Sequence, residues 1–502
     1  MRRIVCKLCS ALVALTVMAT SAMADVKMPN IFGDHMVLQQ GQKDKVWGTA
    51  GPGEEITVTI EKQSHKTKAG ADGKWSVSVD PLSVGGPYTL TVAGKNTLKF
   101  EDVLVGEVWI CSGQSNMQWS VNVSNDADLE KLTAKFPKIR LISVPQVGTQ
   151  EPQDNFNGKW QLCTPETVGN FSAVGYFFGR QLHQTLDVPI GLINNAWGGS
   201  ACEAWIRRDL LAADEKYKPL LARWAQSEAT FAELSDKKDL NDDQKKQLAG
   251  LTGQMRGNAR PGNIYNGVLK SHIGYGIRGA IWYQGESNAG RAYQYRELFP
   301  LMIKSWRDEW AVGDFSFYWV QLADFMAEKP EPADSSWAEL REAQTMTLKL
   351  PNTGEAVIID IGEGRDIHPR NKQDVAKRLA RWALAKDYGI KLHHQSPTYK
   401  SMETKDNKVI LTFDYVGSGL YAFDTPEPRG FTIAGDDRKF YSAQAKIIGP
   451  NQVELSCDKV SHPEAVRYAW ADNQVCNLYS RDGLPVTPFR TDTWPGVTAS
   501  AN

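Results

Sequence analysis

The sequence predicts an α/β protein in which a central parallel β-sheet lies between two β-rich regions. In the middle of the chain, apolar runs fit for buried strands alternate with helical patterns, which is typical of parallel strands joined by crossover helices. Towards both ends, short segments alternate polar and apolar residues between turn residues, as antiparallel strands do. The 502 residues exceed what one hydrophobic core usually holds, so we expect several domains.

Residues 1–24 predict a secretory signal peptide. Three basic residues (Arg2, Arg3 and Lys7) precede a short apolar stretch, and Ala22 and Ala24 fit an A-x-A cleavage site. No later run reaches the roughly 20 apolar residues that a membrane-spanning helix needs. We therefore expect an exported protein, periplasmic or extracellular, without a membrane anchor.

Residues 25–101 predict a small antiparallel β-sandwich. Alternating segments at 55–60, 75–79 and 88–92 are separated by Gly- and Pro-containing turns. This N-terminal β region should form a domain of its own.

Residues 102–394 predict the central α/β domain, with a flavodoxin-like parallel sheet. Between the strands at about 191–195 and 280–283, the stretch 210–256 is rich in charge and poor in strand formers. It predicts an inserted helical hairpin, which we interpret as a solvated excursion in preference to a lid. The other strands are expected at 103–110, 315–322 and 356–360, and the helices at 172–186, 293–310, 338–350 and 370–388.

Residues 395–502 predict a second β-rich region packed on the central domain. Its short strand patterns lie at 409–413, 431–433, 446–448 and 453–455.

Ser115 is the candidate nucleophile. The apolar run 103–110 stops at the small and polar residues Cys-Ser-Gly-Gln, directly before this serine. In open α/β sheets ligands bind beyond the carboxyl ends of the strands, so the serine would stand where a substrate binds.

His368 is the candidate general base, with Asp366 beside it. Pro369 biases His368 towards extended backbone, and in an extended segment residues two apart point to the same side. A carboxylate that orients a histidine, which then deprotonates a serine, is the recurring arrangement of acyl transfer.

Two further strand ends offer donors for an oxyanion. Gly198 and Gly199 would allow close backbone approach, and Gln284 and Asn288 carry side-chain amides. These residues are therefore candidate donors to an oxyanion.

The blocks GEVWICSGQSNMQWSV, NNAWGGS, IWYQGESNA, DIGEGRDIHPRNKQDVAKRLARWAL and RYAWADNQVCNLYSRDGLPVTPFRTD resemble the sialate O-acetylesterase family of the SGNH hydrolase superfamily. The resemblance covers nearly the whole expected mature chain. It implies an SGNH hydrolase domain, with Ser115 as nucleophile and His368 as base. By the same resemblance, the oxyanion hole would consist of the backbone N–H of Ser115, a glycine of the pair Gly198 and Gly199, and Gln284 or Asn288.

The resemblance leaves the third catalytic residue open. Many SGNH enzymes place an aspartate three residues before the histidine, where this chain has Arg365, and Asp366 is the nearest substitute. Related carbohydrate esterases use the glutamate of a QGE turn, which is Glu286 here. Both carboxylates therefore remain candidates.

The expected substrate is an O-acetylated carbohydrate, and the expected reaction is a Ser–His ester hydrolysis without a cofactor. Trp119 and Trp197 offer aromatic faces for a sugar ring, and Arg365 could bind the carboxylate of a sialate. Sialic acid is the favoured substrate by resemblance. Acetylated xylan or another plant polysaccharide is the alternative, and a non-catalytic carbohydrate-binding protein is a further one.

Composition argues against several other functions. Loss of the signal peptide would reduce 57 basic residues to 54 against 58 acidic ones, so nothing indicates nucleic-acid binding. The histidines lack metal-ligand spacing, and no protein partner is indicated. Five cysteines would remain, mostly as isolated thiols, with one possible disulfide between Cys457 and Cys476.

Overall fold

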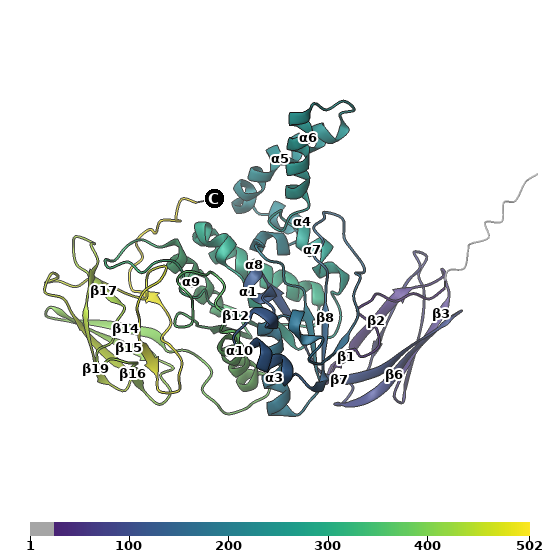
Figure 1. The fold of residues 1–502 in the computed structure, drawn as a ribbon, viewed down its shortest axis with the longest axis horizontal. Coiled ribbons are helices and arrows are strands. Elements are labelled where there is room, and N and C mark those ends of the chain that lie inside the picture. Colours follow the sequence, from purple (N-terminus) through teal and green to yellow (C-terminus); the bar gives the residue numbers. More distant parts are fainter. Residues whose placement is uncertain (1–24, 502) are drawn as a thin grey trace, which may run out of the picture.

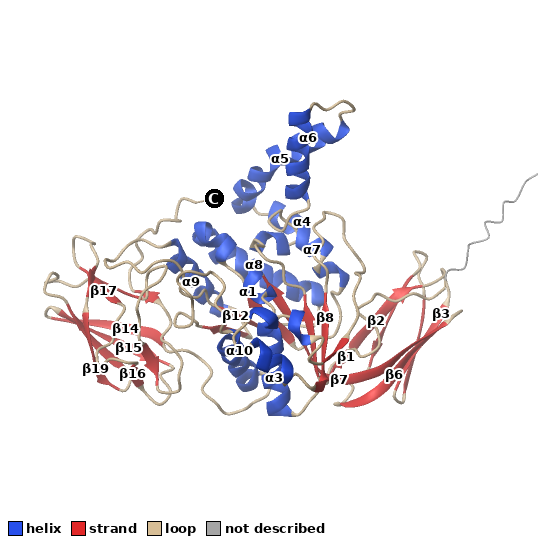
Figure 2. Cartoon of the chain, viewed as in Figure 1, coloured by secondary structure: helices blue, strands red, loops and turns tan. Residues whose placement is uncertain are grey.

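The computed structural model describes residues 25–501, and within them two β-rich regions flank a central α/β region (Figure 1). The predicted fold class is confirmed: the central sheet is largely parallel and both flanks are built of strands (Figure 2). The predicted signal peptide, residues 1–24, lies outside the described residues.

The central sheet has the strand order β13–β12–β11–β7–β10–β8–β9. Neighbouring strands are parallel from β13 to β8, and β9 pairs antiparallel with β8. In the order of flavodoxin the first strand lies between the second and the third, whereas here the first, β7, lies between the third, β10, and the fourth, β11. The strands are β7 (Thr97–Gly113), β8 (Phe136–Ser143), β9 (Gln161–Cys163), β10 (Ile190–Asn194), β11 (Gly279–Tyr283), β12 (Ser316–Val320) and β13 (Thr353–Ala356).

The strand order reverses at β7, which lies between β10 and β11. From β7 the chain first builds β8 and β10 on one side and then β11, β12 and β13 on the other. A crevice beyond the carboxyl ends of the strands forms at such a reversal point. The loops after β7, β10 and β11 therefore meet at the place where an open α/β sheet binds its ligand.

Helices cover both faces of this sheet. On one face α3 (Ala173–Leu186) and α10 (Lys372–Lys386) pack on side chains such as Trp109 and Ile281. On the other face α8 (Ala292–Trp310) and α9 (Ser336–Met346) bury Trp282. Successive strand residues point to opposite faces, so an entirely apolar strand such as β11 serves both layers.

The N-terminal β region shares a strand with the central sheet. The first part of β7 pairs antiparallel with β6 (Gly85–Ala93), and its last part is the parallel strand between β10 and β11. At the changeover Asp102 has a left-handed φ of 54°, and its carboxylate accepts hydrogen bonds from the buried Arg140. The other strands of this region are β1 (Val37–Gln39), β2 (Asp44–Thr49), β3 (Glu55–Ile60), β4 (Gln63–Lys68) and β5 (Lys74–Val79).

Two helices, α5 (Lys218–Asp236) and α6 (Asp242–Met255), project from the central region as an antiparallel hairpin (Figure 2). Asn241 and Gln244 cap α6 reciprocally, each side chain accepting from the other's backbone N–H. The shorter helices are α1 (Ser115–Gln118), α2 (Ala127–Leu132), α4 (Arg208–Ala212) and α7 (Asn263–Gly267).

The C-terminal β region contains two four-stranded antiparallel sheets and a two-stranded ribbon. The first sheet has the order β14 (Thr398–Lys405), β15 (Lys408–Asp414), β20 (Gln452–Ser456), β19 (Gln444–Gly449). The second has the order β18 (Tyr441–Ser442), β17 (Phe431–Ala434), β21 (Ala465–Tyr468), β23 (Phe489–Arg490), and the ribbon joins β16 (Leu420–Ala422) to β22 (Leu478–Ser480).

One strand prediction is wrong in its bounds. The strand expected at 356–360 ends at Ala356, and the apolar residues that follow are buried without a strand ladder. Val357 and Ile359 belong to the core of the C-terminal β region. The apolar run therefore reflects packing between two regions of the protein as well as a strand.

The cysteines are all free thiols in residues 25–501, so the possible pair Cys457–Cys476 is not formed. In the same residues no helix has the length and apolarity needed to cross a lipid bilayer.

Candidate active site

The nucleophile turn joins β7 to α1. Gly113 ends the strand at φ 131°, and a Cβ on it would lie 2.2 Å from the carbonyl oxygen of Tyr283, which only glycine avoids. Gln114 precedes the helix, and Ser115 is its first residue. The serine therefore stands at the carboxyl end of the strand where the order of the sheet reverses.

His368 meets Ser115 from a separate part of the chain. Its Nε2 lies 2.9 Å from Ser115 Oγ, although the two residues are 253 positions apart. The imidazole stacks on Trp119, with ring centroids 4.7 Å apart and planes 11° from parallel. Stacking restricts the ring's orientation, so the histidine is held with one nitrogen towards the serine.

Asp366 is the carboxylate that contacts His368. Its Oδ1 accepts the backbone N–H of His368 at 2.9 Å and lies 3.4 Å from Nδ1 of the ring. The pKa of His368 is lowered by burial, raised in part by the charge of Asp366 and lowered further by Lys372. A histidine with a lowered pKa stays neutral, and so able to accept a proton, in more acidic solution.

Glu286 contacts the residue that follows Ser115. It is bound to Asn116, whose Nδ2 donates to Oε1 at 2.7 Å, and no hydrogen bond joins it to His368. Its second oxygen, Oε2, is buried without a hydrogen-bond partner, and burial raises the pKa of this carboxyl. Of the two predicted candidates, only Asp366 is therefore in contact with the histidine.

Lys372 completes this buried group and was not predicted from the sequence. It is fully buried, and its Nζ donates to Asn116 Oδ1 at 2.5 Å. Burial lowers the pKa of the ammonium to about 7, against the opposing charge of Glu286. The available signal was position: Lys372 lies four residues after His368 in the block that carries the family resemblance.

Gly198 faces the nucleophile across a short gap. A Cβ on Gly198 would lie 3.4 Å from the Cβ of Ser115. Its N–H donates to Oε1 of Gln118 at 2.7 Å, and Gln118 is an exposed residue. Gly199 follows in the left-handed region at φ 71°. This turn presents backbone N–H groups beside Ser115, as an oxyanion site requires.

Gln284 and Asn288, the predicted side-chain donors, are buried and bonded to each other. Gln284 is fully buried, and its Nε2 donates to the carbonyl of Ser200 and to Asn288 Oδ1. Asn288 accepts from the backbone of Cys202 and donates to Glu203. These amides therefore hold the strand ends together, and their role as oxyanion donors stays a prediction.

Comparison with known proteins places this site in a family. The family model described as carbohydrate esterase, sialic acid-specific acetylesterase, matches residues 105–235 and 255–383. The chain belongs to this family. The matched residues include Ser115 and His368, whereas the unmatched stretch 236–254 takes in most of α6, so this part of the hairpin lies outside the family pattern.

The esterase is similar to several named proteins over nearly its whole length. Sialate O-acetylesterase of Mus musculus is 31% identical over 93% of this chain and 95% of its own length. That of Homo sapiens is 30% identical over 95% of both chains. A carbohydrate acetylesterase from Xanthomonas citri, a solved structure, is 39% identical with a TM-score of 0.80, over 93% of this chain and 100% of that one. The prediction of a carbohydrate-acting ester hydrolase is confirmed, and a non-catalytic binding protein is not supported.

The cationic residues near the esterase's catalytic turns differ in how they are engaged. Arg207 pairs with Asp209 and Glu309, and Arg291 pairs with Glu203. Arg365 is exposed at the corner of the turn that precedes His368, and in residues 25–501 no ion pair involves it.

Each of the two predicted aromatic contacts, Trp119 and Trp197, is half-buried and has partners within the protein. Trp119 turns one face to His368 and donates its Nε1–H to the carbonyl of Val123. Trp197 is half-buried and packs against the core beneath α8, while its backbone N–H binds Gly113. Part of each indole therefore serves the site's own structure.

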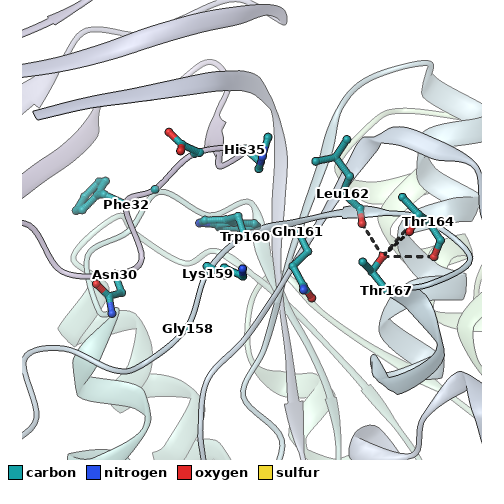
Figure 3. A pocket seen from close by; sticks show the side chains of 12 residues that line it. Asn30, Phe32, His35, Gly158, Lys159, Trp160, Gln161, Leu162, Thr164 and Thr167 are labelled. Carbon is teal, nitrogen blue, oxygen red and sulfur yellow. Dashed lines mark hydrogen bonds between the residues drawn. The ribbon is translucent and has the colours of Figure 1, made fainter.

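A separate cavity of about 660 Å³ lies where the N-terminal region meets β9 (Figure 3). Phe32, His35, Trp160 and Thr167 are among its lining residues, and none of the catalytic residues is. In the described part of the chain, no cluster of three or more His, Cys, Asp or Glu side chains is arranged to hold a metal ion.

Proposed function

We propose that the protein is an exported sialate O-acetylesterase that hydrolyses its substrate through an acetyl-serine intermediate. The observation that carries this proposal is the 2.9 Å contact between His368 Nε2 and Ser115 Oγ at the reversal point of the sheet. The family and the names of the relatives support an O-acetylated sugar as the substrate. The signal-peptide pattern of residues 1–24 supports export.

In the first half-reaction, Ser115 Oγ attacks the acetyl carbonyl carbon while its proton moves to His368 Nε2. For Nε2 to accept, the neutral imidazole carries its hydrogen on Nδ1, and Asp366 Oδ1 is the acceptor placed to hold that tautomer. The C–O bond to the sugar then breaks, and the sugar oxygen leaves with the proton from His368. In the second half-reaction His368 Nε2 takes a proton from water as the water oxygen attacks the acetyl carbon. The C–O bond to Ser115 then breaks, Ser115 Oγ receives the proton from His368, and acetate is released.

The tetrahedral oxyanion needs donors on the side away from the histidine. The N–H groups of Ser115 and of the Gly198–Gly199 turn are the nearest candidates. The Oε1 of Gln118, which now accepts from Gly198, occupies the position that a substrate oxygen would take. Because Gln118 is exposed, its side chain can move aside when substrate enters. Each backbone donor should contribute about 10²–10³ in kcat.

Arg365 supports sialate over neutral acetylated sugars. A sialate carries a carboxylate, and recognition of a carboxylate favours a guanidinium without an internal partner. Arg207 and Arg291 are occupied by acidic neighbours, whereas Arg365 is exposed in the turn that carries Asp366 and His368.

The test measures acetate release from O-acetylated sialic acid and from acetylated xylo-oligosaccharides by the wild type and by Ser115→Ala. We expect release from the sialate, with turnover at least about 10³-fold lower in Ser115→Ala, which should remain folded because the change only removes a hydroxyl. Release from the xylo-oligosaccharides alone would assign a plant-polysaccharide acetylesterase. Full activity in Ser115→Ala would place the nucleophile elsewhere.

A further inference from the structure

Asn116 ties the nucleophile turn to the segment that carries the general base. It directly follows Ser115 and is buried. Its Nδ2 donates both to the carbonyl of Ile367, at 3.0 Å, and to Glu286, at 2.7 Å. Ile367 directly precedes His368, so a single amide side chain connects the neighbours of the two catalytic residues.

The position of Lys372 is unfavourable for a lysine in two ways. The side chain is fully buried, and desolvation of an ammonium costs several kcal/mol. It is also the first residue of α10, where the positive end of the helix dipole opposes a cation. In residues 25–501 no carboxylate forms a direct ion pair with it, and its hydrogen bond goes to Asn116. With a pKa of about 7 the side chain is a cation below neutral pH, and the hydrogen bond of that cation is to Asn116.

The charges on either side of Asn116 determine which way its amide faces. The carbonyl oxygen accepts from the ammonium of Lys372, and the NH₂ group donates to the carboxyl of Glu286. Reversal of the amide would bring its oxygen against Glu286 and against the carbonyl of Ile367, and its NH₂ against the ammonium. The cation therefore stabilises the orientation that connects the two catalytic segments.

Lys372 also lies near the indole of Trp119, the ring on which His368 stacks. Its Nζ lies 5.9 Å from the ring centre of Trp119, and the same indole stacks on His368. It lies 5.2 Å from the ring of Tyr283 as well, at the end of β11.

We propose that Lys372 is a positioning residue of this esterase: through Asn116 it holds the turn of Ser115 against the segment of His368. The inference rests on the proposed function, in which Ser115 and His368 carry out the chemistry. Removal of the ammonium should loosen the alignment of the pair without removing any group that touches the substrate, so it should lower kcat and leave KM nearly unchanged.

The test compares Lys372→Met, Asn116→Leu and the double variant on a neutral aryl acetate. Because a displacement of about 1 Å can cost 10²-fold, we expect kcat of each single variant to fall about 100-fold, with KM within about threefold. If Lys372 acts through Asn116, the double variant should be no slower than Asn116→Leu alone. Losses that multiply, or wild-type kcat in Lys372→Met, would overturn the inference.

A pH profile separates this role from general destabilisation. The charges that act on His368 are those of Asp366 and Lys372, and the ammonium lowers the pKa of the histidine. Loss of the ammonium should therefore raise that pKa and move the acid limb of kcat/KM to higher pH. Arg307→Met is the matched control, because Arg307 is also a buried cation but binds loop carbonyls such as that of Phe315. It should lower Tm and leave kcat and the acid limb unchanged.

Two further measurements keep the result decisive. Because Lys372→Met leaves Glu286 buried without its neighbouring cation, Lys372→Met/Glu286→Gln, in which neither side chain is charged, is measured beside it. We expect kcat of this double variant to fall as much as that of Lys372→Met. A double variant with the kcat of the wild type would overturn the inference. If the wild type released no acetate, the proposed function would fail on its own. NMR titration of His368 in wild type and Lys372→Met would then decide the inference: a raised pKa and altered ring resonances support it, and unchanged ones overturn it.

Discussion

Replacement of Asp366 by asparagine should lower kcat/KM about tenfold, much less than the same change in a buried catalytic triad. The contact between Asp366 Oδ1 and His368 Nδ1 is long, at 3.4 Å, and the carboxylate side chain is 42% exposed. Two unit charges at this separation interact by about 1 kcal/mol in water and about 5 kcal/mol at an effective dielectric constant of 20. For a carboxylate this exposed we take the lower part of that range, about 1–2 kcal/mol, which corresponds to about 5–30-fold.

Geometry supports the same magnitude. The asparagine oxygen can still accept the backbone N–H of His368, which Asp366 Oδ1 accepts at 2.9 Å, so the turn should keep its shape. Asp366→Ala removes this acceptor as well and should cost about tenfold more. In a buried triad the change from aspartate to asparagine costs about 10⁴-fold, because the histidine is then held in the wrong tautomer.

The assay is kcat/KM on a neutral aryl acetate as a function of pH. The charge of Asp366 raises the pKa of His368, so Asp366→Asn should lower that pKa and extend activity to lower pH. Glu363→Gln is the control, because this carboxylate lies in the same turn and accepts the backbone N–H of Arg370. A fall in kcat/KM of more than about 10³-fold would refute the argument that solvent weakens the interaction between the exposed Asp366 carboxylate and His368. Unchanged kcat/KM and an unchanged acid limb would mean that the enzyme works as a Ser–His dyad.

Three other outcomes follow from the structure. Gly198→Ala should lower kcat about 10–100-fold with little change in Tm, because the new methyl group would lie 3.4 Å from the Cβ of the nucleophile; unchanged turnover would remove this turn from the oxyanion site. Arg365→Ala should raise KM for O-acetylated sialic acid and leave turnover of a neutral aryl acetate unaltered, and an equal loss on both would make the residue structural. Burial lowers the pKa of His272 to about 3, so below pH 6.5 the unfolded chain binds a proton there that the folded protein does not. This difference in proton binding lowers the free energy of unfolding by about 2 kcal/mol at pH 5. The loss should disappear in His272→Gln and remain in the exposed control His462→Gln. Urea unfolding at two pH values measures it.

The catalytic strand ends could be predicted because they are local patterns. A buried strand reads as an apolar run, and its end reads as a change to small and polar residues, so Ser115 and the neighbourhood of His368 stand out in the printed sequence. The same reasoning placed the helices on either side of the sheet to within a few residues. Val357 and Ile359 show its limit, because burial against another region produces the same apolar run as a strand ladder.

The features that the sequence did not reveal depend on tertiary contacts. Lys372 lies in a helix with an ordinary amphipathic pattern, and a lysine in such a helix usually faces solvent. Only the fold brings it against Asn116. Gln284 carries the amide that an oxyanion needs, but its hydrogens are used by partners that the sequence pattern does not identify. Local patterns thus indicate where the chemistry is, whereas hydrogen-bond partners decide which polar groups are available for it.

The continuity of β7 limits how this esterase could be shortened or recombined. A chain begun at residue 102 would cut β7, the strand that leads to Ser115, and would remove β6, which pairs with the first part of β7. It would also remove His35, whose Nδ1 lies 2.7 Å from the Asp102 carboxylate. Exchange of the N-terminal region between related esterases should therefore require a junction upstream of Gly85, with β6 and β7 inherited together. Because both regions share β7, substitutions in the N-terminal region should affect the active site through this strand, even if the N-terminal region does not bind substrate.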